Sequence, residues 1–180
     1  MIHPVLTTAR LQLRGFADDD LDLLHRLYGD PEVMRHLGDG TPMSREVTQE
    51  KLASVVFRWL QLGIPLWAVF RKDDGAFLGR CGFSPYEPLN SIELAYTFVP
   101  PAWDQGFATE ASRACLRHAF EVLGWEKIMC RTRPDNVRSR RVMEKLGFQF
   151  EREGLDIGGA AVFYWLTRGQ FATERNALPR

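Results

Sequence analysis

The sequence lacks an excess of charge of either sign, because 23 Lys and Arg residues are balanced by 23 Asp and Glu residues. Proteins that hold nucleic acid or an anionic membrane by long-range electrostatics carry a net positive field. The basic residues are nonetheless uneven: Arg outnumbers Lys by 19 to 4, and five Arg lie within residues 131–141. Arginine binds oxyanions through pairs of hydrogen bonds, so this segment suits phosphate. An RNA-binding module is disfavoured, because the net charge is zero and because repeated aromatic residues between the basic ones are missing.

Cysteine is scarce, and long apolar runs are missing. Cys81, Cys115 and Cys130 match neither a disulfide framework nor a metal knuckle, so we expect buried, reduced thiols and no metal site. No run approaches the roughly 18 apolar residues that a membrane span needs, and the first residues lack a basic start followed by an apolar stretch. These absences predict a cytoplasmic protein with no membrane partner.

Linkers, internal repeats and low-complexity tracts are also missing. Hydrophobic residues make up 45% of the 180 residues, which is ordinary for a globular protein with one sizeable core. We therefore expect a single domain over residues 1–180, with its core in about residues 5–168 and a polar surface tail at 171–180.

Hydrophobic periodicity predicts an alternation of strands and helices. Helix starts are indicated by the carboxylates of 18–20, by Asp30 before Pro31, and by Ser44 ahead of an apolar stripe of Leu52, Val55, Val56, Trp59 and Leu60. The further elements expected are strands at 11–16, 66–70, 77–83, 91–99, 127–133, 148–153 and 160–167 and helices at 109–123 and 139–146. This order predicts an α+β, α/β-like fold with a single mixed sheet and helices on both faces.

Two segments carry candidate chemistry. Gly106 stands at the mouth of a helix, where backbone N–H groups and the helix dipole favour a pyrophosphate; a plain loop-to-helix turn is the alternative interpretation. Downstream, Asn136 and Ser139 are three residues apart between a strand and a helix, so both can face one ligand, although ordinary helix capping explains them equally well.

These segments together resemble a known family. Residues 92–120, IELAYTFVPPAWDQGFATEASRACLRHAF, look like the acetyl-CoA-binding motif of the GNAT superfamily, and DNVRSRRVMEKLGF at 135–148 looks like its next motif. With residues 7–37 in front, the chain resembles the branch that contains the ribosomal-protein alanine N-acetyltransferases over nearly its full length. The resemblance implies a strongly twisted sheet whose fourth and fifth strands splay apart to hold acetyl-CoA.

The resemblance also implies a set of cofactor-binding residues: Phe98, Val99, Trp103, Gln105, Gly106, Phe107, Ala108, Thr109, Asn136 and Ser139. The backbone of Phe98 and Val99 would pair with the pantetheine arm, the N–H groups of residues 105–109 would bind the pyrophosphate, and Asn136 would hold the pantetheine end. Ser139 would lie near the sulfur and protonate the departing thiolate. Trp103 departs from the Gln or Arg of the family pattern, which excludes a side-chain phosphate contact there.

Acetyl transfer to an amine needs a proton acceptor. An attacking amine must be neutral, and an α-amino group with a pKa near 8 is partly neutral already. Glu93 is the candidate general base, because it lies on the strand that enters the cofactor loop and points away from the apolar face of that strand. A surface carboxylate on a half-exposed strand is an equally open interpretation. A backbone N–H of the splayed strand would stabilise the oxyanion.

The sequence therefore predicts an acetyl-CoA-dependent N-acetyltransferase acting on a protein N-terminus or a small amine. The alternative is a non-catalytic acyl-CoA-binding sensor or assembly protein on the same fold. Acceptor choice is expected to depend on residues 28–65 and on the loop at 156–160; Asp30, Glu32, Asp39, Glu46 and Glu50 could attract a cationic amine or simply form solvated helix faces. A monomer and a homodimer are both compatible with the sequence.

Overall fold

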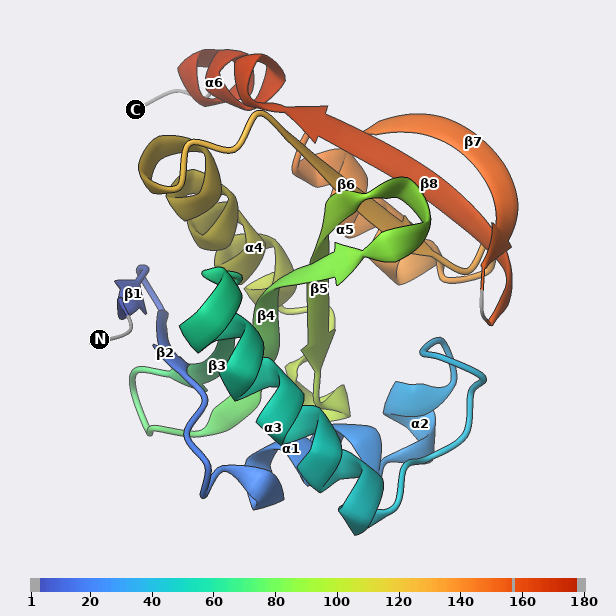
Figure 1. Ribbon diagram of the computed structural model, residues 1–180. Helices are drawn as coiled ribbons and strands as arrows, with labels where there is room; N and C mark the ends of the chain where they lie inside the picture. Colours follow the sequence, from blue (N-terminus) through green and yellow to red (C-terminus); the bar gives the residue numbers. More distant parts are fainter. Residues whose placement is uncertain (1–3, 157, 178–180) are drawn as a thin grey trace.

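A mixed β-sheet runs through the computed structural model, which describes residues 4–156 and 158–177 (Figure 1). The strands are β1 (Leu6–Thr7), β2 (Leu11–Gly15), β3 (Leu66–Arg71), β4 (Phe77–Tyr86), β5 (Ser91–Phe98), β6 (Lys127–Thr132), β7 (Gln149–Asp156) and β8 (Gly159–Thr167). They are arranged in the order β1-β2-β3-β4-β5-β6-β8-β7, and the described residues form eight strands in one sheet. The predicted single mixed sheet is confirmed.

Helices cover both faces of this sheet. They are α1 (Leu21–Tyr28), α2 (Pro31–Met34), α3 (Arg45–Leu62), α4 (Phe107–Arg117), α5 (Val137–Lys145) and α6 (Arg168–Ala177). Figure 1 shows α3 in front of β4 and β5, with α4 behind them. On the α4 side, the Cys81 thiol of β4 lies 3.4 Å from the Ser112 hydroxyl of α4; on the other side, Arg58 of α3 reaches Ser84 of β4. Successive residues of β4 and β5 therefore face different helical layers.

The predicted caps hold for α2 and α3 but not for α1. The Asp30 side chain accepts hydrogen bonds from the N–H groups of Glu32 and Val33, and Ser44 accepts one from Val47. Asp20 occupies the N-cap position of α1, but its carboxylate binds the Arg14 guanidinium at 2.6 and 2.8 Å and the Ala17 N–H instead. The guanidinium offers a charge-assisted pair, which is stronger than a cap to a neutral amide.

The apolar stripe of α3 is narrower than predicted. Leu52 and Val55 are buried, and Val56 and Trp59 pack against the core, whereas Leu60 is 42% exposed. One residue further along a helix is a rotation of about 100°, so Leu60 turns away from the sheet that Trp59 contacts.

The sheet opens between β5 and β6. β4 and β5 pair in antiparallel register from Gly79 with Phe98 to Tyr86 with Ser91. β5 and β6 run parallel, and in the described part of the chain one bridge joins them, Glu93 with Met129. Beyond this bridge the two strands diverge and leave a wedge. The predicted splay therefore falls between β5 and β6, because the short β1 adds one strand to the count.

The C-terminal segment differs from the prediction. Residues 168–177 form α6 rather than a polar tail; residues 178–180 lie outside the described residues. Phe171 is 8% exposed and stacks against Phe120 with ring centroids 5.3 Å apart. At the start of α6, Arg168 pairs with the Glu126 carboxylate and its N–H donates to the Glu126 carbonyl. Phe171 and Arg168 together hold a segment of mainly polar composition on the core.

α4 begins at Phe107, two residues earlier than predicted, and from His118 to Val122 it continues as a π-helical turn.

The three cysteines are free and buried, as predicted. None of the described helices is long and apolar enough to cross a membrane.

Candidate active site

Strand parity decides which backbone groups of β5 face the wedge. The Val99 N–H donates to the Leu78 carbonyl of β4 at 2.9 Å, and the Val99 carbonyl accepts from the Ala102 N–H at 2.9 Å. Because alternate residues direct their backbone groups to opposite edges, Thr97 also faces β4, whereas Tyr96 and Phe98 face the wedge. Both Val99 groups are engaged inside the protein. The pantetheine contact predicted for Phe98 stays a prediction that this parity supports, and Tyr96 joins it.

Trp103 lies at the entrance of the wedge. Its indole N–H donates to the Phe98 carbonyl at 2.7 Å. The Arg138 guanidinium of α5 stands over the Trp103 ring at 5.2 Å and pairs with the Asp104 carboxylate at 3.3 Å. These contacts join the loop after β5 to α5 across the wedge.

The start of α4 presents backbone donors. Gly106 is its N-cap residue, with a φ of 79° that L side chains rarely adopt, and glycine has no side chain that could cap the helix. The first-turn N–H groups of residues 107–109 have no acceptor within a helix, and the helix dipole favours negative charge there. Phe107 is buried and fixes this end of α4, and the exposed Gln105 folds its amide onto the Pro101 carbonyl at 2.6 Å. The arrangement fits a pyrophosphate.

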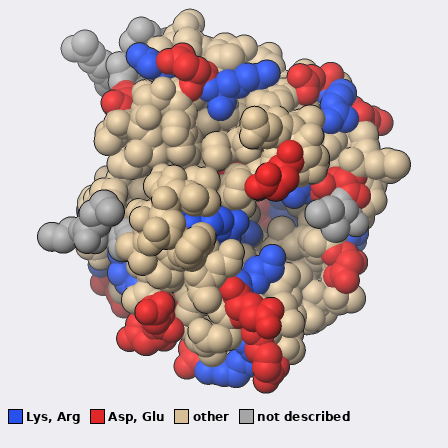
Figure 2. Space-filling view, viewed as in Figure 1, with Lys and Arg blue, Asp and Glu red and all other residues tan. Residues whose placement is uncertain are grey.

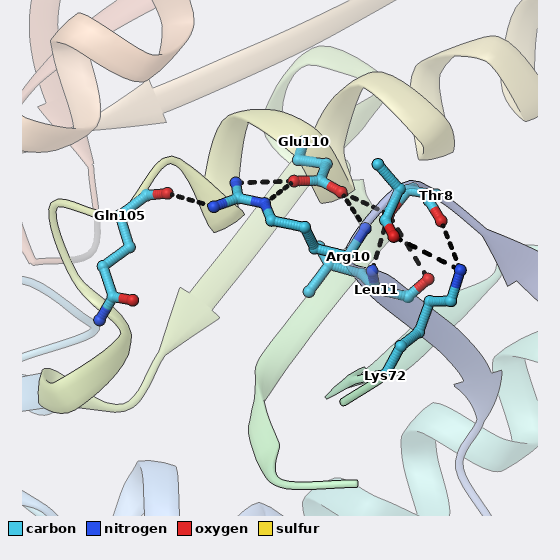
Figure 3. A network of polar contacts seen from close by, with 7 residues as sticks. Thr8, Arg10, Leu11, Lys72, Gln105 and Glu110 are labelled. Atoms are coloured by element: carbon cyan, nitrogen blue, oxygen red, sulfur yellow. Dashed lines mark hydrogen bonds and ion pairs between the residues drawn. The ribbon is translucent and has the colours of Figure 1, made fainter. Parts of the chain in front are cut away.

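A polar network holds this helix start against the first strands (Figure 3). Arg10 reaches the Glu110 carboxylate through Nε and Nη2 at 2.7 Å each, and its Nη1 donates to the Gln105 carbonyl at 3.0 Å. Thr8 donates to the other Glu110 oxygen at 2.6 Å, and the Arg10 guanidinium lies 4.4 Å from the Phe107 ring centroid. Burial alone would raise the pKa of Glu110, but the hydrogen bonds from Thr8 and Arg10 lower it. Glu110 is therefore a neutralised anchor of the loop.

Asn136 and Ser139 begin α5 on the other side of the wedge. The Asn136 side-chain oxygen accepts from the Ser139 N–H at 3.2 Å, so Asn136 caps α5, as the alternative interpretation predicted. The Ser139 hydroxyl lies 2.8 Å from the Tyr96 hydroxyl, and Tyr96 also donates to the Ser139 carbonyl at 3.1 Å. Burial, followed by nearby Cys130, raises the pKa of Tyr96 well above its ordinary value of 10. Tyr96 therefore stays a neutral donor.

Glu93 lies on the opposite face of β5 from Tyr96. Its side chain is 13% exposed and pairs with Arg131 of β6 at 3.4 Å, and Arg131 is shared with the Asp156 carboxylate. Tyr86 donates to Asp156 at 3.1 Å. Burial raises the pKa of Glu93 above its usual 4.5, against the lowering effects of Arg131 and Arg80. Glu93 is therefore not a surface carboxylate, and its raised pKa suits a proton acceptor.

Three of the five Arg residues of 131–141 have partners in different parts of the protein. Arg131 binds Glu93 and Asp156, Arg133 donates to the Gly38 carbonyl at 3.0 Å, and Arg140 donates to the Tyr164 hydroxyl at 3.2 Å. A phosphate contact from this segment stays a prediction, and Arg138 at the wedge entrance is the residue best placed for it.

Sequence reasoning missed Arg10, Glu110 and Tyr96. Tyr96 carried a weak signal, since a buried tyrosine usually finds a partner for its hydroxyl. Arg10 and Glu110 are 100 residues apart and gave none. The described residues hold no group of three or more His, Cys, Asp or Glu side chains placed to bind a metal.

The comparisons with known proteins agree with this geometry. Residues 10–149 match the family described as the acetyltransferase (GNAT) domain. The uncharacterized protein YkkB of Bacillus subtilis is 34% identical over 155 residues, which cover 82% of this chain and 86% of that protein. The uncharacterized N-acetyltransferase YoaA of Bacillus subtilis is 28% identical over 151 residues, covering 83% and 85%.

A solved structure shows the same fold. The ribosomal alpha-N-protein acetyltransferase RimL, in complex with coenzyme A, superposes with a TM-score of 0.78 at 18% identity, covering 91% of this chain and 98% of that one.

Proposed function

Because this chain belongs to the GNAT family of acetyltransferases and is an N-acetyltransferase, we propose that it binds acetyl-CoA in the wedge between β5 and β6 and transfers the acetyl group directly to a primary amine. The amine is the α-amino group of a peptide or that of a small molecule. The observation that carries this proposal is the divergence of β5 and β6 beside the glycine-capped start of α4, with a buried carboxylate at the closed end of the wedge. We also propose a single domain over residues 1–180 and a cytoplasmic location.

The residues around the wedge fit acetyl-CoA. The N–H groups of 105–109 and the positive φ of Gly106 leave the backbone open to a pyrophosphate, and a side chain at 106 would sit 3.5 Å from Arg10 Nη2. The wedge-facing backbone groups of Tyr96 and the N–H of Phe98 suit the amides of an extended pantetheine arm, while the Phe98 carbonyl is bound by Trp103. Bound there, acetyl-CoA supplies an activated acetyl thioester.

Glu93 accepts the proton that the amine loses, directly or through one water. Its raised pKa improves it as a base near neutral pH, while Arg131 holds it in place and keeps it ionised. The Tyr96 N–H is the first β5 donor beyond the Glu93–Met129 bridge to face the wedge. It can stabilise the negative charge that develops on the acetyl carbonyl oxygen.

The hydroxyls of Ser139 and Tyr96 stand where a thiolate would leave. Ser139 passes its proton to the sulfur and regains one from solvent, while the adjacent Tyr96 hydroxyl stays protonated and orients Ser139. The proton from the amine therefore stays on one face of the sheet, at Glu93, and the thiolate is protonated from the other.

Calorimetric titration with acetyl-CoA tests the proposal, since it needs no knowledge of the acceptor. We expect micromolar binding by the native protein and a loss of more than about tenfold for Gly106→Val, because valine is strained at this φ and narrows the donor cradle. Gly75→Val is the matched control: its φ of 70° is similar, but it lies in the β3–β4 turn with open space around it. No detectable binding of acetyl-CoA, or equal binding by both variants, would overturn the proposal.

A further inference from the structure

Three cations gather on the Glu93 face of the sheet. In the β4–β5 register Ser84 lies opposite Glu93, and Arg80 lies opposite Thr97. Side chains directly opposite in a sheet are about 5 Å apart at Cβ, so these four share one face. Arg58 of α3 donates to the Ser84 hydroxyl at 3.3 Å, which brings its guanidinium beside Glu93.

These cations stand close to one another. Burial and the positive charge of Arg80 lower the pKa of Arg58. Lys51 lies about two turns before Arg58 on α3. Burial, then the positive charges of Arg80 and Arg58, lower the pKa of Lys51. Figure 2 shows blue Lys and Arg atoms inside and around the hollow between the α1–α3 part and the β7–β8 hairpin. The cluster formed by Lys51, Arg58 and Arg80 is called the cationic cluster below.

Around the cationic cluster, positive charge exceeds negative charge. Glu93 and Asp156 both pair with Arg131, and among the side chains that the structure describes no carboxylate forms an ion pair with Lys51, Arg58 or Arg80. Two of the acidic residues expected to attract a cationic amine have other partners: Asp30 caps α2, and Asp39 binds the Thr41 N–H and hydroxyl.

Two buried polar atoms on this face are unsatisfied. Arg80 Nε and Thr97 Oγ1 have no hydrogen-bond partner within the described residues, and they belong to directly paired positions. Buried polar atoms in folded proteins are nearly always hydrogen-bonded, to the protein, to a water or to a ligand, so a bound group that pairs with both atoms would complete this face. The Tyr28 ring, 5.4 Å from the Arg80 guanidinium, holds that side chain in position.

We propose that the acceptor amine carries a carboxylate, which Arg80 and Arg58 bind together with the Thr97 hydroxyl while the amine faces Glu93. This inference rests on the proposed function and narrows its substrate class to amino-carboxylates. A carboxylate satisfies Arg80 Nε and Thr97 Oγ1 and neutralises the repulsion between the two guanidinium groups. A polyamine or another purely cationic amine would add to that repulsion.

The same cluster acts on the amine. A positive field disfavours the ammonium form, so the cationic cluster raises the neutral fraction that can attack the thioester. The carboxylate of the substrate supplies binding, and the surrounding cations help to deprotonate its amine.

Matched acceptors test the inference. The probes are free amino acids, their carboxamides, and peptide pairs with Glu or Gln at the second position, assayed with acetyl-CoA by release of CoA. We expect kcat/KM for the carboxylates to exceed that for the amides by about 10- to 100-fold, as charge-assisted hydrogen bonds imply. If the enzyme acetylates the Glu peptides but not the free amino acids, the carboxylate that the cluster binds is that of a side chain. Amides that react as well as carboxylates would overturn the inference and leave acetyl transfer intact.

Variants assign the effect to the cluster. Arg80→Met and Arg58→Gln are each expected to reduce the preference to less than about threefold. Arg71→Met is the control, because Arg71 lies on the same sheet and pairs with Asp74. Unchanged acetyl-CoA binding verifies that a variant is folded. If Arg80→Met does not fold, Arg58→Gln still tests the inference, because Arg58 lies on a different element, α3. A preference that survives both substitutions would contradict the inference.

Titration of the same amino acids into enzyme saturated with CoA separates the two proposals. Arg80-dependent binding without any turnover would support the carboxylate site and contradict transfer to these amines. No binding of any carboxylate, together with no turnover, would overturn the carboxylate site.

Discussion

The hydroxyls of Ser139 and Tyr96 lie 2.8 Å apart where α5 meets β5, and either can be the donor. Tyr96 also donates to the Ser139 carbonyl at 3.1 Å. Tyr96 therefore holds Ser139 through two contacts, and the Ser139 proton can be directed at a sulfur in the wedge.

Removing either hydroxyl should slow the chemical step. We expect Ser139→Ala and Tyr96→Phe each to lower kcat by about 10²-fold or more with little change in acetyl-CoA affinity, since protonation of a leaving group contributes on this scale. Because Tyr96 acts through Ser139, the double variant should cost about as much as either single variant. Additive losses in steady-state kinetics would show that the two hydroxyls act independently.

The acid limb of the pH–rate profile should report Glu93. Its carboxylate form is the active one, and burial raises its pKa, so kcat/KM should fall as the pH drops through a value above the usual 4.5. Arg131 opposes this rise. Arg131→Gln should therefore move the acid limb to higher pH, whereas Arg71→Gln should leave it in place.

Glu93→Gln should remove that limb and lower kcat by about 10²- to 10⁴-fold while acetyl-CoA still binds. A variant that keeps both its turnover and its acid limb would remove Glu93 from the mechanism.

The Arg10–Glu110 pair should support cofactor affinity from outside the wedge. Arg10→Met leaves the Glu110 carboxylate uncompensated beside the expected pyrophosphate and frees the Gln105 carbonyl, so we expect the Kd for acetyl-CoA to rise roughly tenfold. Adding Glu110→Gln should restore part of the affinity, because the repulsive charge is gone. Equal affinity of the native protein and Arg10→Met in calorimetry would disprove this role.

Helix α6 should contribute measurably to stability. Phe171→Ala removes a buried ring that stacks on Phe120, which should cost about 2–4 kcal/mol in the free energy of unfolding. Phe57, which is 59% exposed on α3, is the matched position, and Phe57→Ala should cost less than about 0.5 kcal/mol. Urea unfolding followed by circular dichroism measures both, and equal midpoints would show that α6 is only an appendage.

Local sequence signals predicted most of the fold. Asp30 and Ser44 cap helices where their types and spacing indicated, and the alternation in residues 91–99 marked β5. The failures came from tertiary partners. Arg14 takes the Asp20 carboxylate that the pattern assigned to a cap, and Phe120 holds Phe171 and with it a segment whose composition is polar.

The candidate site divides in the same way. Gly106, Glu93 and Ser139 stand in ordered motifs and could be named from the sequence. Tyr96 could not be separated from an apolar strand face until its hydroxyl was seen against Ser139. The cationic cluster joins α3 to β4, and no short-range pattern relates Arg58 to Arg80.

Within the described residues, one bridge, Glu93 with Met129, joins the two parts of the sheet, which are β1 to β5 and β6 to β8. A molecule bound between these two parts would connect them, since it hydrogen-bonds to the part of β5 that β6 leaves unpaired. Binding should make this junction more rigid. The hydrogen-exchange rate of the Tyr96 backbone amide should then fall on binding, and it should fall by more than that of any amide in the middle of β4, which is already paired on both sides.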